Sequence, residues 1–116
     1  MNIQIFGTKK SSDARKAERW FKERRVKAQF IDLLDKGISR GELRGAAQAC
    51  GGLDALIDDD ARDRDALALV RYAAPAQRED ALLSHPQVLK QPIVRNGKKA
   101  AVGYRPEVYQ AWLEEG

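Results

Sequence analysis

The feature that most constrains the fold is a short apolar strand that passes through a turn into an amphipathic helix. Ile3 to Phe6 is apolar and partly alternating, and Gly7 marks the turn. Ser11 or Ser12 can cap the helix, because a serine hydroxyl accepts an unpaired backbone N–H. A second apolar segment, Val26 to Leu34, follows the helix. A strand, a helix of about 14 residues and a second strand predict a right-handed βαβ unit with parallel strands.

The middle of the chain, from about residue 38 to residue 84, is predicted to be a helical block. Ser39 and Glu42 have the spacing of a capping box, which opens a helix that stops at Gly51-Gly52. The acidic run at 58–60 suits the start of another helix, and Pro75 is expected to end it. This helix is predicted over residues 61–72, and a further one over residues 76–83.

A hairpin and a final helix complete the predicted order. Asn96-Gly97 is the strongest hairpin signal in the chain, because both residues tolerate a positive φ. Apolar residues flank this turn, and Pro106 stands at or near the first position of a last helix. This order predicts an α/β (α+β) domain with a four-stranded mixed sheet. Helices over residues 11–24 and 105–114 should pack on the sheet, with the helical block beside one end.

Size and composition fit one soluble domain over residues 1–116, with 43% hydrophobic and 33% charged residues. The net charge of +4 is uneven, because residues 1–50 hold 12 basic and 6 acidic side chains, whereas residues 51–85 hold 4 and 8. A basic first half is able to attract an acidic partner, nucleic acid included. The interleaved charges of residues 15–19 favour a solvated helix face instead.

Other classes of function are disfavoured by what the chain lacks. No apolar run approaches the roughly 20 residues of a membrane span, and the first residues lack the zones of a signal peptide, so a cytoplasmic protein without membrane contact is expected. Cys50, the one cysteine, lies on an apolar helix face, which favours packing over a displaced redox role. His85 is the only histidine and the aspartates at 58–60 match no calcium loop, so no metal site is predicted.

Four segments of the chain carry a resemblance to a known family. They read SSDARKA at 11–17, GLDALI at 52–57, HPQVLKQPIV at 85–94 and VGYRPE at 102–107. Together with the order of elements, they resemble the ArsC/Spx family of thioredoxin-like proteins over nearly the whole chain. That family includes glutathione-linked arsenate reductases, related thiol reductases and Spx-type regulators that bind RNA polymerase. The resemblance implies a thioredoxin-like fold with a helical insert at about residues 38–84.

The resemblance also implies that the reactive centre of the reductases is missing. Their nucleophilic thiolate corresponds to Ser11, and the second cysteine of Cys-x-x-Cys members corresponds to Ala14. A serine hydroxyl is a poor nucleophile near neutral pH and forms no reducible disulfide. The arginines that bind the oxyanion correspond to Asp58, to Gln91 and to a position near Arg105, so at most one remains. No arsenate or disulfide reductase activity is therefore expected.

The same loop keeps groups that are suited to binding. The start of the helix could hold an anion with its backbone amides, although plain helix capping is the favoured interpretation. In thioredoxin-like folds the proline that corresponds to Pro92 is cis and shapes the substrate groove, so Gln91-Pro92 is expected to be cis and to face Ser11 and Ala14. The candidate binding residues are Lys9, Lys10, Ser11, Ser12, Arg15, Gln91, Pro92 and Arg105.

Two functions stay open at this point. The first is a protein without reductase activity that binds a protein partner or a small thiol, with the transcription machinery suggested by analogy with Spx. The alternative is a glutathione-dependent thiol or arsenate reductase-like enzyme that uses the thiol of bound glutathione. No cofactor is expected, and glutathione is left open as a ligand. Nucleic-acid binding ranks last, because Trp20 and Phe21 lie on the apolar stripe and leave no aromatic residue beside the exposed basic side.

Overall fold

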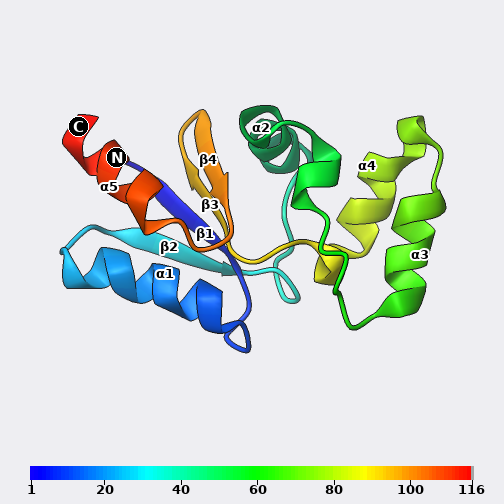
Figure 1. Ribbon diagram of the computed structural model, residues 1–116, viewed down its shortest axis with the longest axis horizontal. Coiled ribbons are helices and arrows are strands. Elements are labelled where there is room, and N and C mark those ends of the chain that lie inside the picture. The colour runs from blue at the N-terminus through cyan, green and yellow to red at the C-terminus, as the bar shows by residue number, and fades with distance from the viewer. Residues whose placement is uncertain (116) are drawn as a thin grey trace.

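A four-stranded mixed sheet carries helices on both of its faces (Figure 1). The computed structural model describes residues 1–115. The strands are β1 Ile3–Gly7, β2 Ala28–Asp32, β3 Ile93–Asn96 and β4 Lys99–Val102, in the order β2-β1-β3-β4. β1 runs parallel to β2 and antiparallel to β3, and β3 forms an antiparallel hairpin with β4. The predicted mixed sheet is confirmed, although β2 is shorter than the apolar segment 26–34 that predicted it.

Helices cover the sheet and extend the molecule to one side (Figure 1). They are α1 Ser12–Glu23, α2 Arg40–Cys50, α3 Arg64–Tyr72, α4 Pro75–Ser84 and α5 Pro106–Glu115, with 3-10 turns η1 Leu53–Leu56 and η2 Pro86–Val88. α1 and α5 pack on one face of the sheet and α2 packs on the other, while α3 and α4 lie farthest from it. Within residues 1–115, no helix combines the length and the hydropathy that a bilayer crossing requires.

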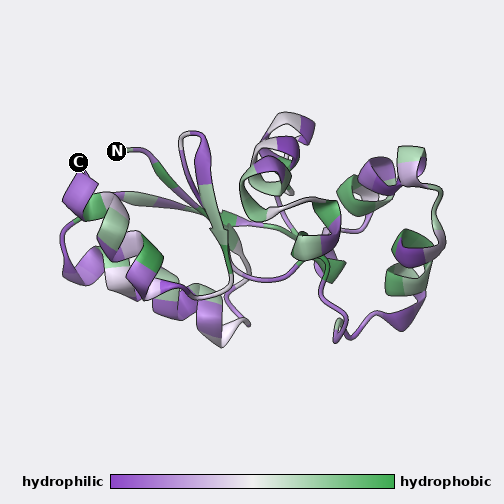
Figure 2. Cartoon of the chain, turned by 45° about the horizontal axis from the view of Figure 1, so that its top comes forward, coloured by the Kyte–Doolittle hydropathy of each residue, from purple (hydrophilic) through white to green (hydrophobic). Residues whose placement is uncertain are grey.

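Alternation along β1 divides the apolar core into two clusters. Ile3 and Ile5 join the cluster beneath α1 and α5, whereas Phe6 joins the opposite cluster beneath α2. Figure 2 shows the apolar residues concentrated along the strands and on the inward sides of the helices. In the first cluster the rings of Trp20 and Tyr109 meet edge to face, with centroids 5.5 Å apart and planes at 65°. Helices thus pack on both faces of the sheet. This packing holds β1 in place, and β1 leads into the loop before α1.

Polar contacts join α2 to the sheet in addition to the apolar ones. Gln4 Nε2 donates to Glu42 Oε2 at 3.2 Å, and Arg95 Nη1 donates to Gln4 Oε1 at 2.8 Å. Gly45 permits this approach, because a Cβ there would lie 3.2 Å from Arg95 Nη2. Ser39 and Glu42 form the predicted capping box. Burial disfavours the charged form of Glu42, but hydrogen bonds from Ser39 and Gln4 outweigh it and hold the pKa of Glu42 below its usual value.

The start of α3 differs from the prediction, because Asp63 caps this helix and the acidic run at 58–60 does not. The Asp63 carboxylate accepts a hydrogen bond from the Ala66 N–H at 3.0 Å, so the helix begins three residues later than predicted. Pro75 also has a different role, since it opens α4 in the first turn instead of ending α3. Both corrections concern which of several competing local signals sets a helix boundary.

Candidate functional site

The loop between β1 and α1 is positioned by a close contact between two small residues. Gly7 ends β1, and an ideal Cβ placed on it would lie 2.7 Å from the Cβ of Ala14. Ala14 is completely buried, so the first turn of α1 packs directly on the end of β1. This contact leaves the loop of residues 8–11 little freedom of position.

Ser11 caps α1, as the sequence predicted. Its backbone is extended, and its hydroxyl accepts a hydrogen bond from the Ala14 N–H at 3.2 Å. Ser12 is the first residue of α1 and is exposed. The hydroxyl that the resemblance assigns to the nucleophile position thus caps the start of α1, and this end of the helix favours negative charge in front of it.

The Gln91-Pro92 bond is cis, as predicted. Gln91 Oε1 accepts two hydrogen bonds from Thr8, one from the backbone N–H at 2.8 Å and one from the hydroxyl at 3.1 Å. We call this pair of contacts the Gln91–Thr8 clasp. Pro92 is buried, and its carbonyl accepts a hydrogen bond from the Gly103 N–H at 2.8 Å. Gln91, which the resemblance places at the position of a family arginine, therefore holds the loop after β1 against the segment before β3.

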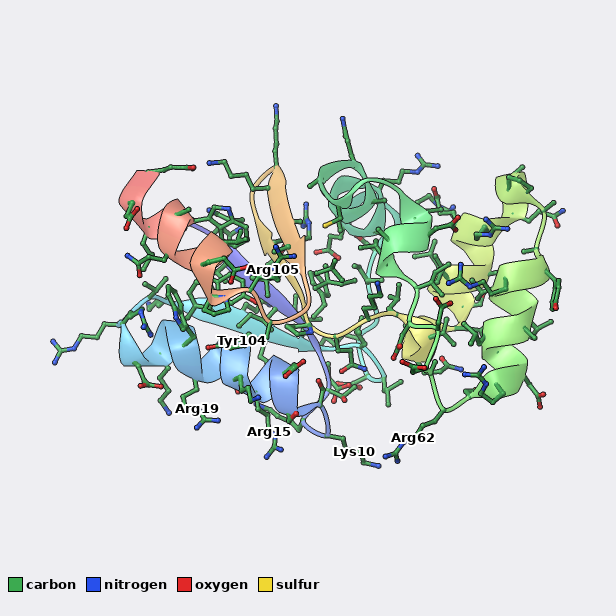
Figure 3. The ribbon with its side chains drawn as sticks, viewed as in Figure 1. Lys10, Arg15, Arg19, Arg62, Tyr104 and Arg105 are labelled. Atoms are coloured by element: carbon green, nitrogen blue, oxygen red, sulfur yellow. The ribbon has the colours of Figure 1, made fainter. Side chains whose placement is uncertain are left out.

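Three of the basic candidates lie away from this loop or are already paired (Figure 3). Lys9 Nζ forms an ion pair with Glu18 at 2.9 Å. Arg15 is exposed on the outer side of α1. Arg105 Nε pairs with Glu107 at 2.7 Å, on the part of the chain that leads into α5. These side chains do not converge on the end of α1, so they do not form one binding site with Ser11.

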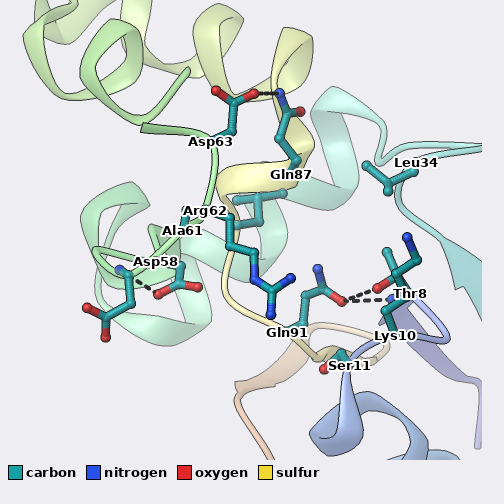
Figure 4. A pocket seen from close by; sticks show the side chains of 12 residues that line it. Thr8, Lys10, Ser11, Leu34, Asp58, Ala61, Arg62, Asp63, Gln87 and Gln91 are labelled. Carbon is teal, nitrogen blue, oxygen red and sulfur yellow. Dashed lines mark hydrogen bonds between the residues drawn. The ribbon is translucent and has the colours of Figure 1, made fainter. Parts of the chain in front are cut away.

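An open cleft of about 460 Å³ lies between the β1–α1 loop and the segment that precedes α3 (Figure 4). Of the eight candidate residues, Lys10, Ser11 and Gln91 line this cleft, whereas the other five do not. The three acidic residues in its lining are Asp58, Asp60 and Asp63. Across the described part of the chain, no three His, Cys, Asp or Glu side chains are grouped to hold a metal ion.

Arg62 is a residue of the cleft that the sequence did not reveal. Its side chain extends from the segment before α3 toward Gln91 (Figure 4), and it forms no ion pair with any carboxylate of residues 1–115. The Asp58 carboxylate accepts a hydrogen bond from the Asp60 N–H at 2.9 Å, so it is held in a turn. Arg62 thus gives the cleft a positive charge from the helical insert. The sequence prediction missed Arg62 because it placed residue 62 inside a helix that began at residue 61.

Cys50 lies at the end of α2, outside the lining of the cleft. Its side chain is partly buried and packs against the cluster beneath α2. Burial raises the pKa of the Cys50 thiol, and the positive charge of Arg105 opposes this shift only in part. Because the thiolate is the reactive form, a raised pKa makes Cys50 a weak nucleophile near neutral pH. The packing role favoured by the sequence agrees with this environment.

The fold and the site define a thioredoxin-like α/β protein, with a cis-proline beside the loop that follows β1 and a helical insert between the two halves of the sheet. The model of the ArsC family matches residues 6–112. The chain belongs to the ArsC family, which confirms the assignment made from the four sequence segments.

Known proteins from two branches of function are similar to this chain. Global transcriptional regulator Spx 2 of Oceanobacillus iheyensis is 29% identical over 115 residues, which cover 97% of this chain and 84% of that protein. The arsenate reductase from Vibrio cholerae has a TM-score of 0.80 at 23% identity, with 96% of this chain and 97% of that chain covered. An arsenate reductase related protein from Brucella melitensis has a TM-score of 0.66 at 21% identity, with 98% and 96% covered. The two structures share the fold.

Proposed function

We propose that this protein is an ArsC family member that acts by binding and has no arsenate or disulfide reductase activity of its own. The observation that carries the proposal is the state of the cleft. No cysteine is among its described lining residues, the Ser11 hydroxyl caps α1, and Gln91 holds Thr8. Reduction needs a nucleophile that is later released through a mixed disulfide, and oxygen forms no such bond.

Arsenate turnover coupled to glutathione and glutaredoxin tests the absence of reductase activity. The wild-type protein should give the background rate, and Cys50→Ser should give the same rate, because the Cys50 thiol lies outside the cleft and has a raised pKa. Turnover well above background in the wild type, lost in Cys50→Ser, would identify Cys50 as the nucleophile and refute the proposal.

A protein partner is the ligand that we favour, and the transcription machinery is the candidate. Its support is the similarity to a protein named a global transcriptional regulator, since the fold alone does not determine function. The experiment is gel filtration of the protein with RNA polymerase from the source organism at about 10 μM each, a concentration that reveals micromolar affinity. Co-elution is expected, with an ArsC family arsenate reductase as the control that does not co-elute. Separate elution would contradict this partner.

A cytoplasmic location, which this partner requires, stays a prediction.

A second candidate is binding of a small thiol, with the bound thiol supplying reductase chemistry. The specific observation is that Lys10, Arg62 and the start of α1 surround one open cleft, which suits the two carboxylates of glutathione. Titration of ¹⁵N-labelled protein with glutathione should then shift the amide signals of Gly7 to Ala14 and of Arg62. Arg62→Gln should weaken these shifts and the exposed Lys98→Gln should not. Unchanged signals at millimolar glutathione would exclude this ligand.

A further inference from the structure

Four basic side chains follow one another along one edge of the molecule: Arg19, Arg15, Lys10 and Arg62 (Figure 3). We call them the basic row. None forms an ion pair with a carboxylate of residues 1–115, although other exposed cations of this chain do, such as Lys9 with Glu18 and Lys16 with Asp13. All four are exposed. The row thus carries positive charge, and within the described chain its N–H donors form no ion pair with a carboxylate.

The spacing of the basic row fits an extended peptide. Arg15 and Arg19 are one helical turn apart on α1, which separates them by about 6 Å along the axis. Alternate side chains of an extended strand are about 6.6 Å apart and point to the same side. An extended segment with acidic residues at every second position therefore places its carboxylates opposite successive arginines, and the planar guanidinium binds carboxylate through two donors. Lys10 and Arg62, which line the cleft, continue the row beyond Arg15.

A shallow hollow of about 220 Å³ adjoins the Arg19 end of the row. It is lined by the charged side chains of Lys16, Arg19 and Glu23, by Tyr104, which is partly exposed, and by Trp20, which is largely buried. The expectation that no aromatic residue lies beside the basic side was therefore wrong. It considered only the residues of α1, whereas Tyr104 comes from the segment that leads into α5.

We propose that the basic row and the hollow at Tyr104 bind an extended acidic segment of a partner protein, a proposal that rests on the binding function proposed above. The acidic residues alternate with neutral ones, and a neutral side chain lies against Tyr104 at the hollow. Carboxylates beside the row interrupt the positive field. They are Asp13 on α1, Glu23 in the hollow, and Asp58, Asp60 and Asp63 in the cleft. A continuous phosphate backbone gains from an unbroken field, so these carboxylates disfavour nucleic acid more than a peptide that can place neutral residues opposite them.

Fluorescence anisotropy with a labelled peptide of alternating glutamate and serine tests the row. Binding should weaken as salt is added, because exposed charges are screened. Arg15→Glu should weaken binding about five- to tenfold, whereas Lys98→Glu, the same charge change on the hairpin between β3 and β4, should change it less than about twofold. Arg15→Glu places an acidic residue in the first turn of α1, where it is tolerated, and circular dichroism verifies the fold.

Three results would overturn the proposal. They are no binding of the peptide at millimolar concentration, an equal loss in Lys98→Glu, or tighter binding of oligothymidylate with the same dependence on Arg15. The RNA polymerase experiment separates this proposal from the function on which it rests. Co-elution that persists in Arg15→Glu would refute the role of the basic row and leave the binding function standing, whereas co-elution lost only in Arg15→Glu supports both.

Discussion

At the scale of single residues, Gly7 and Ala14 are constrained by each other. The Cβ of an alanine at position 7 would approach the Ala14 Cβ to 2.7 Å, which real side chains do not tolerate. A Cβ is bonded directly to the backbone, so no side-chain rotation moves it, and the backbone at both positions is buried. The small size of both residues is therefore a packing requirement of the loop, independent of any ligand.

We predict that Gly7→Ala destabilises the protein by about 1–3 kcal/mol, because α1 must shift to relieve the overlap. Gly41→Ala is the matched control, since its added Cβ meets nothing within 4 Å in α2, and it should stabilise by about 0.5–1 kcal/mol. Urea unfolding of both variants measures the difference. Equal stability of Gly7→Ala and the wild type would show that the contact relaxes without cost.

The Gln91–Thr8 clasp makes a second prediction at the residue scale. Gln91→Arg replaces the acceptor of two hydrogen bonds by a donor, so the N–H of buried Thr8 loses its partner. An unsatisfied buried donor costs about 1–3 kcal/mol, and we expect Gln91→Arg to lower the free energy of unfolding by this amount. Gln91→Glu keeps an oxygen acceptor and should lose less. The idea fails if the two variants unfold at the same urea concentration.

At the scale of elements, the attachment of α2 depends on an ionised glutamate. Because the pKa of Glu42 is below its usual value in the folded protein, the unfolded chain binds more protons between that lowered pKa and the ordinary value of about 4.3. Stability therefore rises with pH across this window and is lost as the pH falls through it. The charge acts at the joint between α2 and the sheet, through Gln4 and Ser39.

We predict that Glu42→Gln is less stable than the wild type at neutral pH and loses less stability on acidification. The variant keeps an acceptor for the capping box, so the change isolates the charge. Urea unfolding at a series of pH values gives the two slopes. Parallel slopes would mean that Glu42 has the same pKa in the folded and unfolded states.

The sequence predicted the features that neighbouring residues determine. It did not predict those that depend on competing caps or on residues far apart in the chain. The capping box at Ser39 and the hairpin signal at Asn96-Gly97 act over a few residues, so their partners are visible in the chain. The turn itself lies one residue later than predicted, because Asn96 pairs with Lys99 in the sheet and Gly97 and Lys98 make the turn. The start of α3 was missed because several aspartates compete for one cap. The place of Arg62 beside Gln91 depends on the insert folding back over the β1–α1 loop, and no short-range pattern reports that.

At the scale of the whole molecule, α3 and α4 form the end that is most independent of the sheet (Figure 1). The Arg78 guanidinium of α4 donates to the carbonyls of Val70, Arg71 and Ala73 at 3.1–3.3 Å, which ties the end of α3 to α4. Tyr72 of α3 is 88% exposed, so this side of the helix gains little from burial. We therefore expect α3 and α4 to open together.

We predict that amides of α3 exchange with solvent at least about tenfold faster than amides of β1, because local opening of α3 and α4 leaves the sheet intact. Hydrogen exchange followed by NMR measures this. Amides of α3 and α4 should share one opening free energy because Arg78 joins them. Uniform protection across the chain would show instead that the insert and the sheet open together.

The Gln91–Thr8 clasp also bears on directed evolution toward arsenate reduction. By the resemblance to the reductases, such a search would place a thiol at position 11 and an arginine at position 91. Each change by itself removes a contact that the present fold uses, the cap of α1 in one case and the clasp in the other. We expect neither change by itself to give a working reductase. Substitution of Thr8 removes only the hydroxyl contact, because the backbone N–H that Gln91 accepts remains at any residue except proline. We therefore expect the search to need a compensating change that gives this N–H a new acceptor.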